Sequence, residues 1–193
     1  MRIVAGRHGG RTLVVPKGMA TRPTSERTRG AIFNILDHAL LPELGRSLAG
    51  ARVLDLFAGS GALGLEALSR GAAQVLFVDD AAAARAAIRE NIEALGETGR
   101  TRIFRRDARR LGARPGTLGP PFDLVFCDAP YHTGAHLEAL DGAARQGWLA
   151  PGALIVLETA ADETAPLPEE FSLREERAYG AARVRFLHYR PAG

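Results

Sequence analysis

The residues best suited to chemistry are Asp128-Ala129-Pro130-Tyr131, which follow an apolar run at residues 122–127. The Asp128 carboxylate and the neighbouring carbonyl of Ala129, held by the stiff Pro130, can accept two hydrogen bonds from one amino group. An amine on an aromatic ring is a weak nucleophile until such acceptors draw its N–H groups out of the ring plane, because its lone pair is delocalised. Tyr131 offers a ring on which a base can stack. The segment therefore suits activation of the exocyclic amine of a base.

A second candidate site is a glycine-rich turn. The strand-like run at residues 53–57 leads into AGSGALG at residues 58–64, so a G-x-G-x-x-G pattern lies between a predicted strand and a predicted helix. Such a turn lets the backbone approach a ligand closely, as both dinucleotides and S-adenosylmethionine (SAM) require. A Walker phosphate loop is excluded, because no Lys follows the glycines.

Three acids at strand ends distinguish these cofactors. Asp55 precedes the glycine turn, where the anionic pyrophosphate of a dinucleotide is disfavoured and the ammonium group of SAM can pair with a carboxylate. Asp79 is placed to accept hydrogen bonds from ribose hydroxyls with either cofactor. Asp107 follows the third strand, where a methyltransferase sheet presents an acid or amide to adenine. Structural roles stay open for each: a buried turn acid, a helix cap and an arginine ion pair. Their joint occurrence favours SAM.

These residues require a sheet to bring them together. Apolar strand-like runs occur at residues 53–57, 75–78, 101–104, 122–127 and 153–157, and helical stretches occur at 62–69, 81–95 and 134–146. This alternation predicts an α/β, doubly wound, mostly parallel sheet covered on both faces. Residues 171–178 and 182–189 predict an antiparallel C-terminal hairpin. The arrangement is that of class I SAM methyltransferases with a Rossmann-like sheet, although the pattern does not determine strand order.

The basic residues are clustered. Residues 1–30 contain seven Lys or Arg and one acid, and residues 100–114 contain seven Arg and one acid, whereas the net charge of the 193 residues is only +3. Clustered guanidinium groups on an otherwise acidic chain favour a phosphate-rich partner, namely nucleic acid.

The N-terminal residues differ from the alternating pattern. Runs at residues 2–5 and 12–15 around a Gly-rich turn suggest a small β-hairpin. Thr24 or Ser25 is the expected N-cap of an amphipathic helix that follows. We expect residues 1–45 to form an extension that contacts RNA and packs on the core, and residues 46–193 to form the methyltransferase domain.

Composition excludes several classes of protein. No run reaches the roughly 18 apolar residues of a membrane span, and the Arg-rich start is unlike a secretory signal. The single cysteine, Cys127, cannot form an internal disulfide, which favours the cytoplasm, and we expect it to be inert packing. His132 and His136 are four residues apart, but we expect surface or capping roles and no metal site.

The sequence resembles the bacterial 16S ribosomal RNA (guanine-N2)-methyltransferase family over nearly the whole chain. The matching segments are the glycine-arginine pattern at residues 6–13, RPTSERTR at 22–29, DLFAGSGALGLEALSR at 55–70 and GWL at 147–149. Asp128-Ala129-Pro130-Tyr131 has the form of the Asp/Asn-Pro-Pro-Tyr/Phe motif of amino-methyltransferases, with Ala129 in place of the first Pro.

The resemblance implies SAM-dependent N2-methylation of a guanine in 16S ribosomal RNA (rRNA) of the assembling small ribosomal subunit, by a cytoplasmic monomer that needs no metal. It places catalysis at residues 128–131. The expected SAM-binding residues are Asp55, Phe57, Ala58, Gly59, Ser60, Gly61, Gly64, Asp79, Asp107 and Ala108. The expected RNA-binding residues are Arg7, Arg11, Arg22, Arg27, Arg106 and Arg109.

Two other functions compete with this interpretation. A DNA adenine amino-methyltransferase would use the same Asp128 chemistry, although 193 residues leave little room for a sequence-reading domain. A nonenzymatic RNA-binding assembly factor could retain the same fold. Transfer of label from SAM to DNA or to ribosomal subunits, and calorimetry with SAM, would distinguish them.

Overall fold

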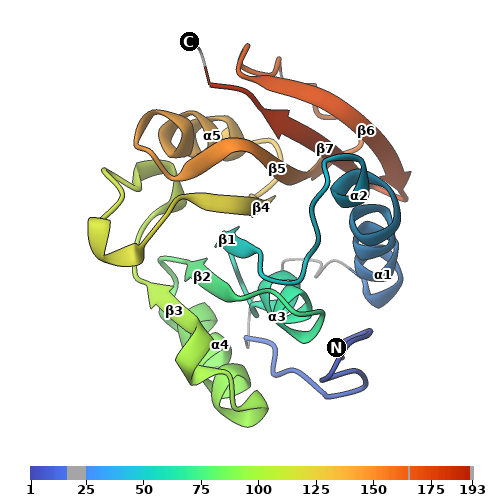
Figure 1. Ribbon diagram of the computed structural model, residues 1–193, viewed down its shortest axis with the longest axis vertical. Helices are drawn as coiled ribbons and strands as arrows, with labels where there is room; N and C mark the ends of the chain where they lie inside the picture. Colours follow the sequence, from blue (N-terminus) through green and yellow to red (C-terminus); the bar gives the residue numbers. More distant parts are fainter. Residues whose placement is uncertain (17–24, 165, 192–193) are drawn as a thin grey trace.

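The computed structural model describes residues 1–16, 25–164 and 166–191. A seven-stranded sheet in the order β3-β2-β1-β4-β5-β7-β6 forms its centre (Figure 1). The strands are β1 (Arg52–Leu56), β2 (Gln74–Val78), β3 (Thr101–Phe104), β4 (Phe122–Asp128), β5 (Leu149–Ala160), β6 (Phe171–Tyr179) and β7 (Ala182–Tyr189). The first five strands are parallel, and β7 pairs antiparallel with both β5 and β6.

Helices cover both faces of the sheet. They are α1 (Glu26–Ile35), a π turn (Leu36–Leu40), α2 (Leu41–Glu43), α3 (Ala62–Ser69), α4 (Ala82–Leu95) and α5 (Ala135–Arg145), with 3-10 turns at Thr98–Arg100, Ala108–Arg110 and Gly116–Leu118. Successive strand residues point to opposite faces, so nearly continuous apolar strands build two cores. One core joins α1, α3 and α4 to the sheet, and the other joins α5 and Trp148 to the opposite face (Figure 1). This is the predicted class I methyltransferase architecture.

The expected N-terminal hairpin is present as a short antiparallel pair, in which the N–H of Ile3 donates to the carbonyl of Arg11 and the N–H of Leu13 to that of Met1, each at 2.9 Å. Its two arms share one isolated antiparallel bridge, between Arg2 and Thr12. The N–H groups of Val4 and Val14 donate to the side chains of Glu66 on α3 and Asn91 on α4. Alternate N–H groups of an antiparallel pair face away from the partner strand, so these side chains satisfy donors that the hairpin leaves free and attach it to the two helices.

The N-terminal residues nevertheless share the main core. Ile3, Leu13 and Phe33 belong to the same apolar cluster as residues of β1 and β2. Ser25 caps α1, because its hydroxyl accepts a hydrogen bond from the N–H of Thr28 at 3.0 Å, as predicted. The domain boundary after residue 45 stays a prediction. Within the described residues, no helix has the length and apolar character needed to span a membrane.

Candidate active site

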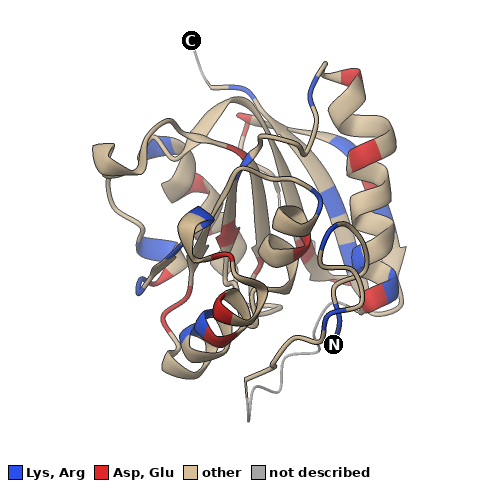
Figure 2. Cartoon of the chain, turned by 60° about the horizontal axis from the view of Figure 1, so that its bottom comes forward, with Lys and Arg blue, Asp and Glu red and all other residues tan. Residues whose placement is uncertain are grey.

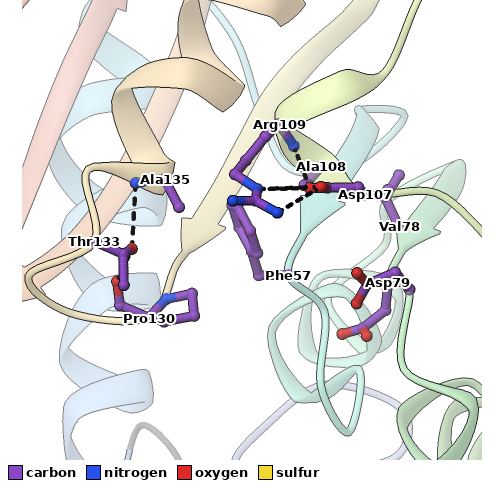
Figure 3. A pocket seen from close by; sticks show the side chains of 10 residues that line it. Phe57, Val78, Asp79, Asp107, Ala108, Arg109, Pro130, Thr133 and Ala135 are labelled. Carbon is purple, nitrogen blue, oxygen red and sulfur yellow. Dashed lines mark hydrogen bonds and ion pairs between the residues drawn. The ribbon is translucent and has the colours of Figure 1, made fainter.

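A pocket of about 240 Å³ lies at the carboxyl ends of the parallel strands (Figure 3). It is lined by Phe57, Val78, Asp79, Asp80, Asp107, Ala108, Arg109, Pro130, Thr133 and Ala135. Val78 ends β2, and the other residues come from the segments after β1, β2, β3 and β4 and from the first residue of α5. Ligands of open α/β sheets bind at this edge, because neighbouring connections diverge there to opposite faces.

The glycine turn after β1 has a special backbone. Phe57 lies in the left-handed region with φ 57°, which is strained for a bulky side chain, and it lines the pocket. Gly64 serves close packing of α3 on the sheet: a Cβ there would lie 2.4 Å from Cε1 of Phe77 and 2.7 Å from Cγ1 of Val75. The glycines of the motif therefore both shape the turn and let the helix approach the strands.

Asp55 lies behind the pocket. It is 2% exposed, and its Oδ2 accepts a hydrogen bond from the N–H of Gly64 at 3.0 Å. Burial raises the pKa of Asp55 to about 8, although the Gly64 hydrogen bond opposes this shift. The buried-turn role left open by the sequence is thus present in the structure, and direct pairing with the SAM ammonium stays a prediction.

Asp79 and Asp107 both line the pocket. The Asp79 carboxylate accepts hydrogen bonds from the N–H groups of Gly59 and Ala81, each at 2.9 Å, so it ties the glycine turn to the start of α4. Burial raises the pKa of Asp79. Asp107 binds Arg109, with 2.7 Å between the closest oxygen and nitrogen, and this hydrogen bond lowers the pKa of Asp107 (Figure 3). The two acids present acceptors of different basicity to one pocket.

The loop after β4 forms another wall. Asp128 ends β4 and is half-buried, Ala129 is buried, and Pro130 lines the pocket. The hydroxyl of Thr133 donates to the carbonyl of Pro130 at 2.6 Å, which closes a tight turn before α5. Tyr131 is half-buried, and its hydroxyl donates to Glu158.

The structure therefore brings together only part of the predicted site. Six of the predicted cofactor, catalytic or RNA-binding residues line the pocket: Phe57, Asp79, Asp107, Ala108, Arg109 and Pro130. The other predicted SAM-site and catalytic residues lie in the adjoining turns or behind the pocket: Asp55, Ala58, Gly59, Ser60, Gly61, Gly64, Asp128, Ala129 and Tyr131. The sequence analysis missed four pocket residues: Val78, Asp80, Thr133 and Ala135. Val78 and Asp80 flank Asp79, and Thr133 and Ala135 follow the Asp128 motif closely, so their position in the sequence could have indicated them.

The predicted RNA-binding arginines have different environments. Arg7, Arg11 and Arg27 are exposed, and Arg7 also forms a 3.0 Å ion pair with Glu97. Arg106 donates to the carbonyl of Leu111 and lies over the ring of Phe104. Arg109 lines the pocket beside Asp107, and Arg22 lies outside the described residues. Their binding to RNA stays a prediction. Figure 2 shows basic residues on several elements of the surface.

The histidines differ from each other. His132 is exposed, as expected, but the surface role expected for His136 was wrong, because that residue is 1% exposed. Its Nδ1 lies 3.7 Å from an oxygen of Glu163, and burial lowers the pKa of His136. Within the described ranges, no group of His, Cys, Asp and Glu is suited to hold a metal ion. Cys127 is buried, which raises the pKa of its thiol, in agreement with a packing role.

Comparisons with known proteins agree with this geometry. The chain is 36% identical over 193 residues to ribosomal RNA small subunit methyltransferase D of Escherichia coli strain K12, covering 100% of this chain and 91% of that protein. It is 33% identical over 186 residues to the Haemophilus influenzae protein of the same name, covering 96% and 92% of the two chains. The solved structure of yhhF from E. coli has a TM-score of 0.79 at 33% identity and covers 100% of this chain and 99% of that one.

A more distant structure supports the fold alone. The Thermus thermophilus 16S rRNA methyltransferase RsmC has a TM-score of 0.61 at 23% identity, covering 91% of this chain and 45% of that one. The model of the family described as Conserved hypothetical protein 95 matches residues 1–188. The chain therefore belongs to this family and has the fold of class I methyltransferases.

Proposed function

We propose that the protein methylates N2 of a guanine in 16S rRNA of the small ribosomal subunit, with SAM as methyl donor. The observation that carries the proposal is the position of the Asp128-Ala129-Pro130-Tyr131 loop at the end of β4: Pro130 lines the same pocket as Asp79 and Asp107. The relatives named as rRNA small subunit methyltransferases support the reaction class and the rRNA substrate.

The pocket fits SAM by the chemistry of its lining. Asp79, at the end of β2, is suited to accept hydrogen bonds from ribose hydroxyls, and Asp107, after β3, is suited to accept one from the adenine amino group. Phe57, Val78 and Ala108 supply apolar surface for the adenine ring. SAM, when bound, supplies an electrophilic methyl group on its sulfonium.

The protein's part in the transfer is to prepare the guanine. The carboxylate of Asp128 and the carbonyl of Ala129 accept hydrogen bonds from the N2 amino group, which restores nucleophilic character to its nitrogen. Tyr131 stacks on the base, and this contact contributes about 1–3 kcal/mol in single-stranded nucleic acids. Positioning and solvation of the developing charge then lower the barrier. Guanine must leave its stack to reach this position.

Substitution of Asp128 tests the proposal directly. Small ribosomal subunits from cells lacking the modification are incubated with labelled SAM and the purified protein, and N2-methylguanosine is identified by nucleoside mass spectrometry. We expect Asp128→Ala to lower kcat at least about 100-fold, since the acceptor acts mainly in the transition state, and to change the SAM Kd by only a few fold.

A matched control comes from the opposite end of the same strand. Asp123 is half-buried and accepts a hydrogen bond from the N–H of Arg52 at 3.0 Å. Asp123→Ala removes a carboxylate of β4 outside the site, so it should retain kcat. Intact SAM binding without transfer to subunits would reject the proposed reaction. Label in DNA adenine would favour the DNA enzyme, and absence of SAM binding would favour the assembly factor.

We also propose that the protein acts as a monomer in the cytoplasm, where ribosomal subunits assemble. Exposed arginines of residues 1–30 and 100–114 would contact backbone phosphates around the target base. Light scattering during size-exclusion chromatography tests the oligomeric state, and a mass twice that of one chain would contradict it.

A further inference from the structure

A buried carboxylate lies beside the proposed catalytic loop. In the parallel pairing of β4 and β5, Asp128 is opposite Glu158. Paired residues of neighbouring strands point to the same face of a sheet. The side chains of Asp128 and Glu158 are therefore neighbours at the carboxyl end of β4. Glu158 is 6% exposed, and its Oε1 accepts a hydrogen bond from the hydroxyl of Tyr131 at 2.7 Å.

This hydrogen bond crosses from the loop to the next strand. The loop contains Ala129, whose φ is not fixed by a ring, and His132, which has a φ of 58°. Thr133 closes the loop on itself through the carbonyl of Pro130, whereas the bond from Tyr131 to Glu158 ties the loop to β5. It therefore restrains the aromatic side chain in a loop that contains one proline.

The chemical groups that form the hydrogen bond between Tyr131 and Glu158 make it a strong one. A neutral hydroxyl donates to a carboxylate, which is stronger than a bond between two neutral groups. Burial and the acceptor Glu158 raise the pKa of Tyr131, and the charge of nearby Asp128 adds to this shift, so the phenol keeps its proton. The carboxylate in turn is shielded from water, so water replaces the hydrogen bond from the phenol poorly if the phenol is lost.

We propose that Glu158 is a positioning residue that holds the Tyr131 ring beside Asp128 for the target base to stack on. The inference rests on the proposed function, because it assigns Tyr131 to the base and leaves SAM to the pocket formed by Phe57, Asp79 and Asp107. Glu158 affects the reaction through Tyr131, which it binds. Its removal therefore lowers kcat/KM for rRNA and leaves SAM affinity unchanged.

A double-mutant cycle tests this role, with transfer to ribosomal subunits as one readout and the SAM Kd from calorimetry as the other. We expect Tyr131→Phe and Glu158→Ala each to lower kcat/KM for rRNA about tenfold, the scale expected for one hydrogen bond to a charged group. The double variant should be no worse than the poorer single variant, because both changes remove the same interaction. Glu158→Gln keeps a carbonyl acceptor and should remain within about threefold of wild type.

Asp123→Ala serves as control for loss of a carboxylate from the same sheet at the end of β4 away from the site, and it should retain kcat/KM. Losses that multiply in the double variant, or a loss of SAM affinity, would overturn the positioning role. If Glu158→Ala does not fold, Tyr131→Phe decides alone: wild-type kcat/KM in this variant refutes the proposal. Absence of transfer by the wild-type protein rejects the proposed function, whereas wild-type transfer with multiplying losses rejects only the role of Glu158.

Discussion

Buried carboxylates have different surroundings in two regions of the molecule: the contact of the N-terminal residues with side chains on and after α3 and α4, and the pocket at the ends of the strands. We call this contact the N-terminal joint; it consists of residues 1–16 and the side chains of Glu66, Asn91 and Glu97. Glu66 is fully buried and accepts hydrogen bonds from the N–H groups of Val4 at 2.7 Å and Ala5 at 3.0 Å. Carboxylates in the pocket also accept backbone N–H groups, but they line an open space.

The difference lies in what surrounds each carboxylate. Glu66 also accepts a hydrogen bond from Arg70 at 2.9 Å and lies 3.5 Å from the buried guanidinium of Arg29. Asp79, in contrast, accepts hydrogen bonds from two backbone donors and lines the pocket. A carboxylate thus stabilises the N-terminal joint where protein donors enclose it, and it can bind a ligand where it borders a pocket.

The comparison also shows that clustered arginines are not equivalent. Arg29 belongs to the N-terminal basic cluster, yet it is 0% exposed and binds Glu66 and the carbonyl of Arg2. Arg102, Arg105 and Arg110 of the second cluster are exposed. Exposed arginines such as these can bind phosphates without breaking a structural contact, whereas Arg29 cannot.

The largest effect should come from removing Arg29, whose buried guanidinium is paired with Glu66 of the N-terminal joint. Arg29→Ala leaves the buried Glu66 with one guanidinium fewer, and we expect the free energy of unfolding to fall by about 3 kcal/mol. Urea unfolding measures this change. Arg27→Ala, two residues earlier on an exposed side of α1, should stay within about 0.5 kcal/mol of wild type. Equal effects of the two substitutions would contradict the structural role of Arg29.

A smaller effect on the free energy of unfolding is expected at Asp55, a carboxylate that is enclosed behind the pocket and does not line it. Its pKa is raised from the ordinary 3.8 to about 8, so the folded state holds this proton more tightly than the unfolded state. The resulting stabilisation is complete below pH 4 and is lost as pH rises towards 8. Asp55→Asn removes this titration and should gain about 1–2 kcal/mol relative to wild type between pH 5 and pH 6.

Thermal unfolding of both proteins across this pH range measures the relative change. Asn keeps a carbonyl that can accept the hydrogen bond from Gly64, so the variant tests ionisation more than shape. Parallel pH profiles of the two proteins would show that Asp55 is already ionised in the folded state.

The smallest effect on stability is expected at an exposed arginine. If Arg102 contacts a phosphate, Arg102→Ala should weaken rRNA binding a few fold and reduce the slope of log affinity against log salt by about 0.7–0.9. Its unfolding free energy should change by less than about 0.5 kcal/mol. Filter binding over a salt series tests this, with the exposed Arg145→Ala on α5 as control. An unchanged slope would remove Arg102 from the RNA contact.

Several elements could be predicted from local pattern because their apolar residues are continuous. The helix at residues 62–69 and the strands at 101–104 and 182–189 agree with α3, β3 and β7. The strand predicted at residues 153–157 is longer, at Leu149–Ala160. The predicted range begins after Pro151 and Gly152, but pairing with β4, with an irregularity between Phe122 and Leu124, extends the strand to include both residues. Hydrogen bonds to a neighbouring strand outweighed local propensity there.

The sequence by itself determined the alternation of strands and helices, the glycine turn and the Asp128 motif, because these depend on residue types close together in the chain. Only the tertiary structure decided that Glu66 and Asn91 bind the N-terminal backbone, that Glu158 meets Tyr131, and that Arg29 and His136 are buried. These contacts join residues 27 to 77 positions apart. The partners of a buried polar group depend on which elements pack together, and local sequence does not specify that packing.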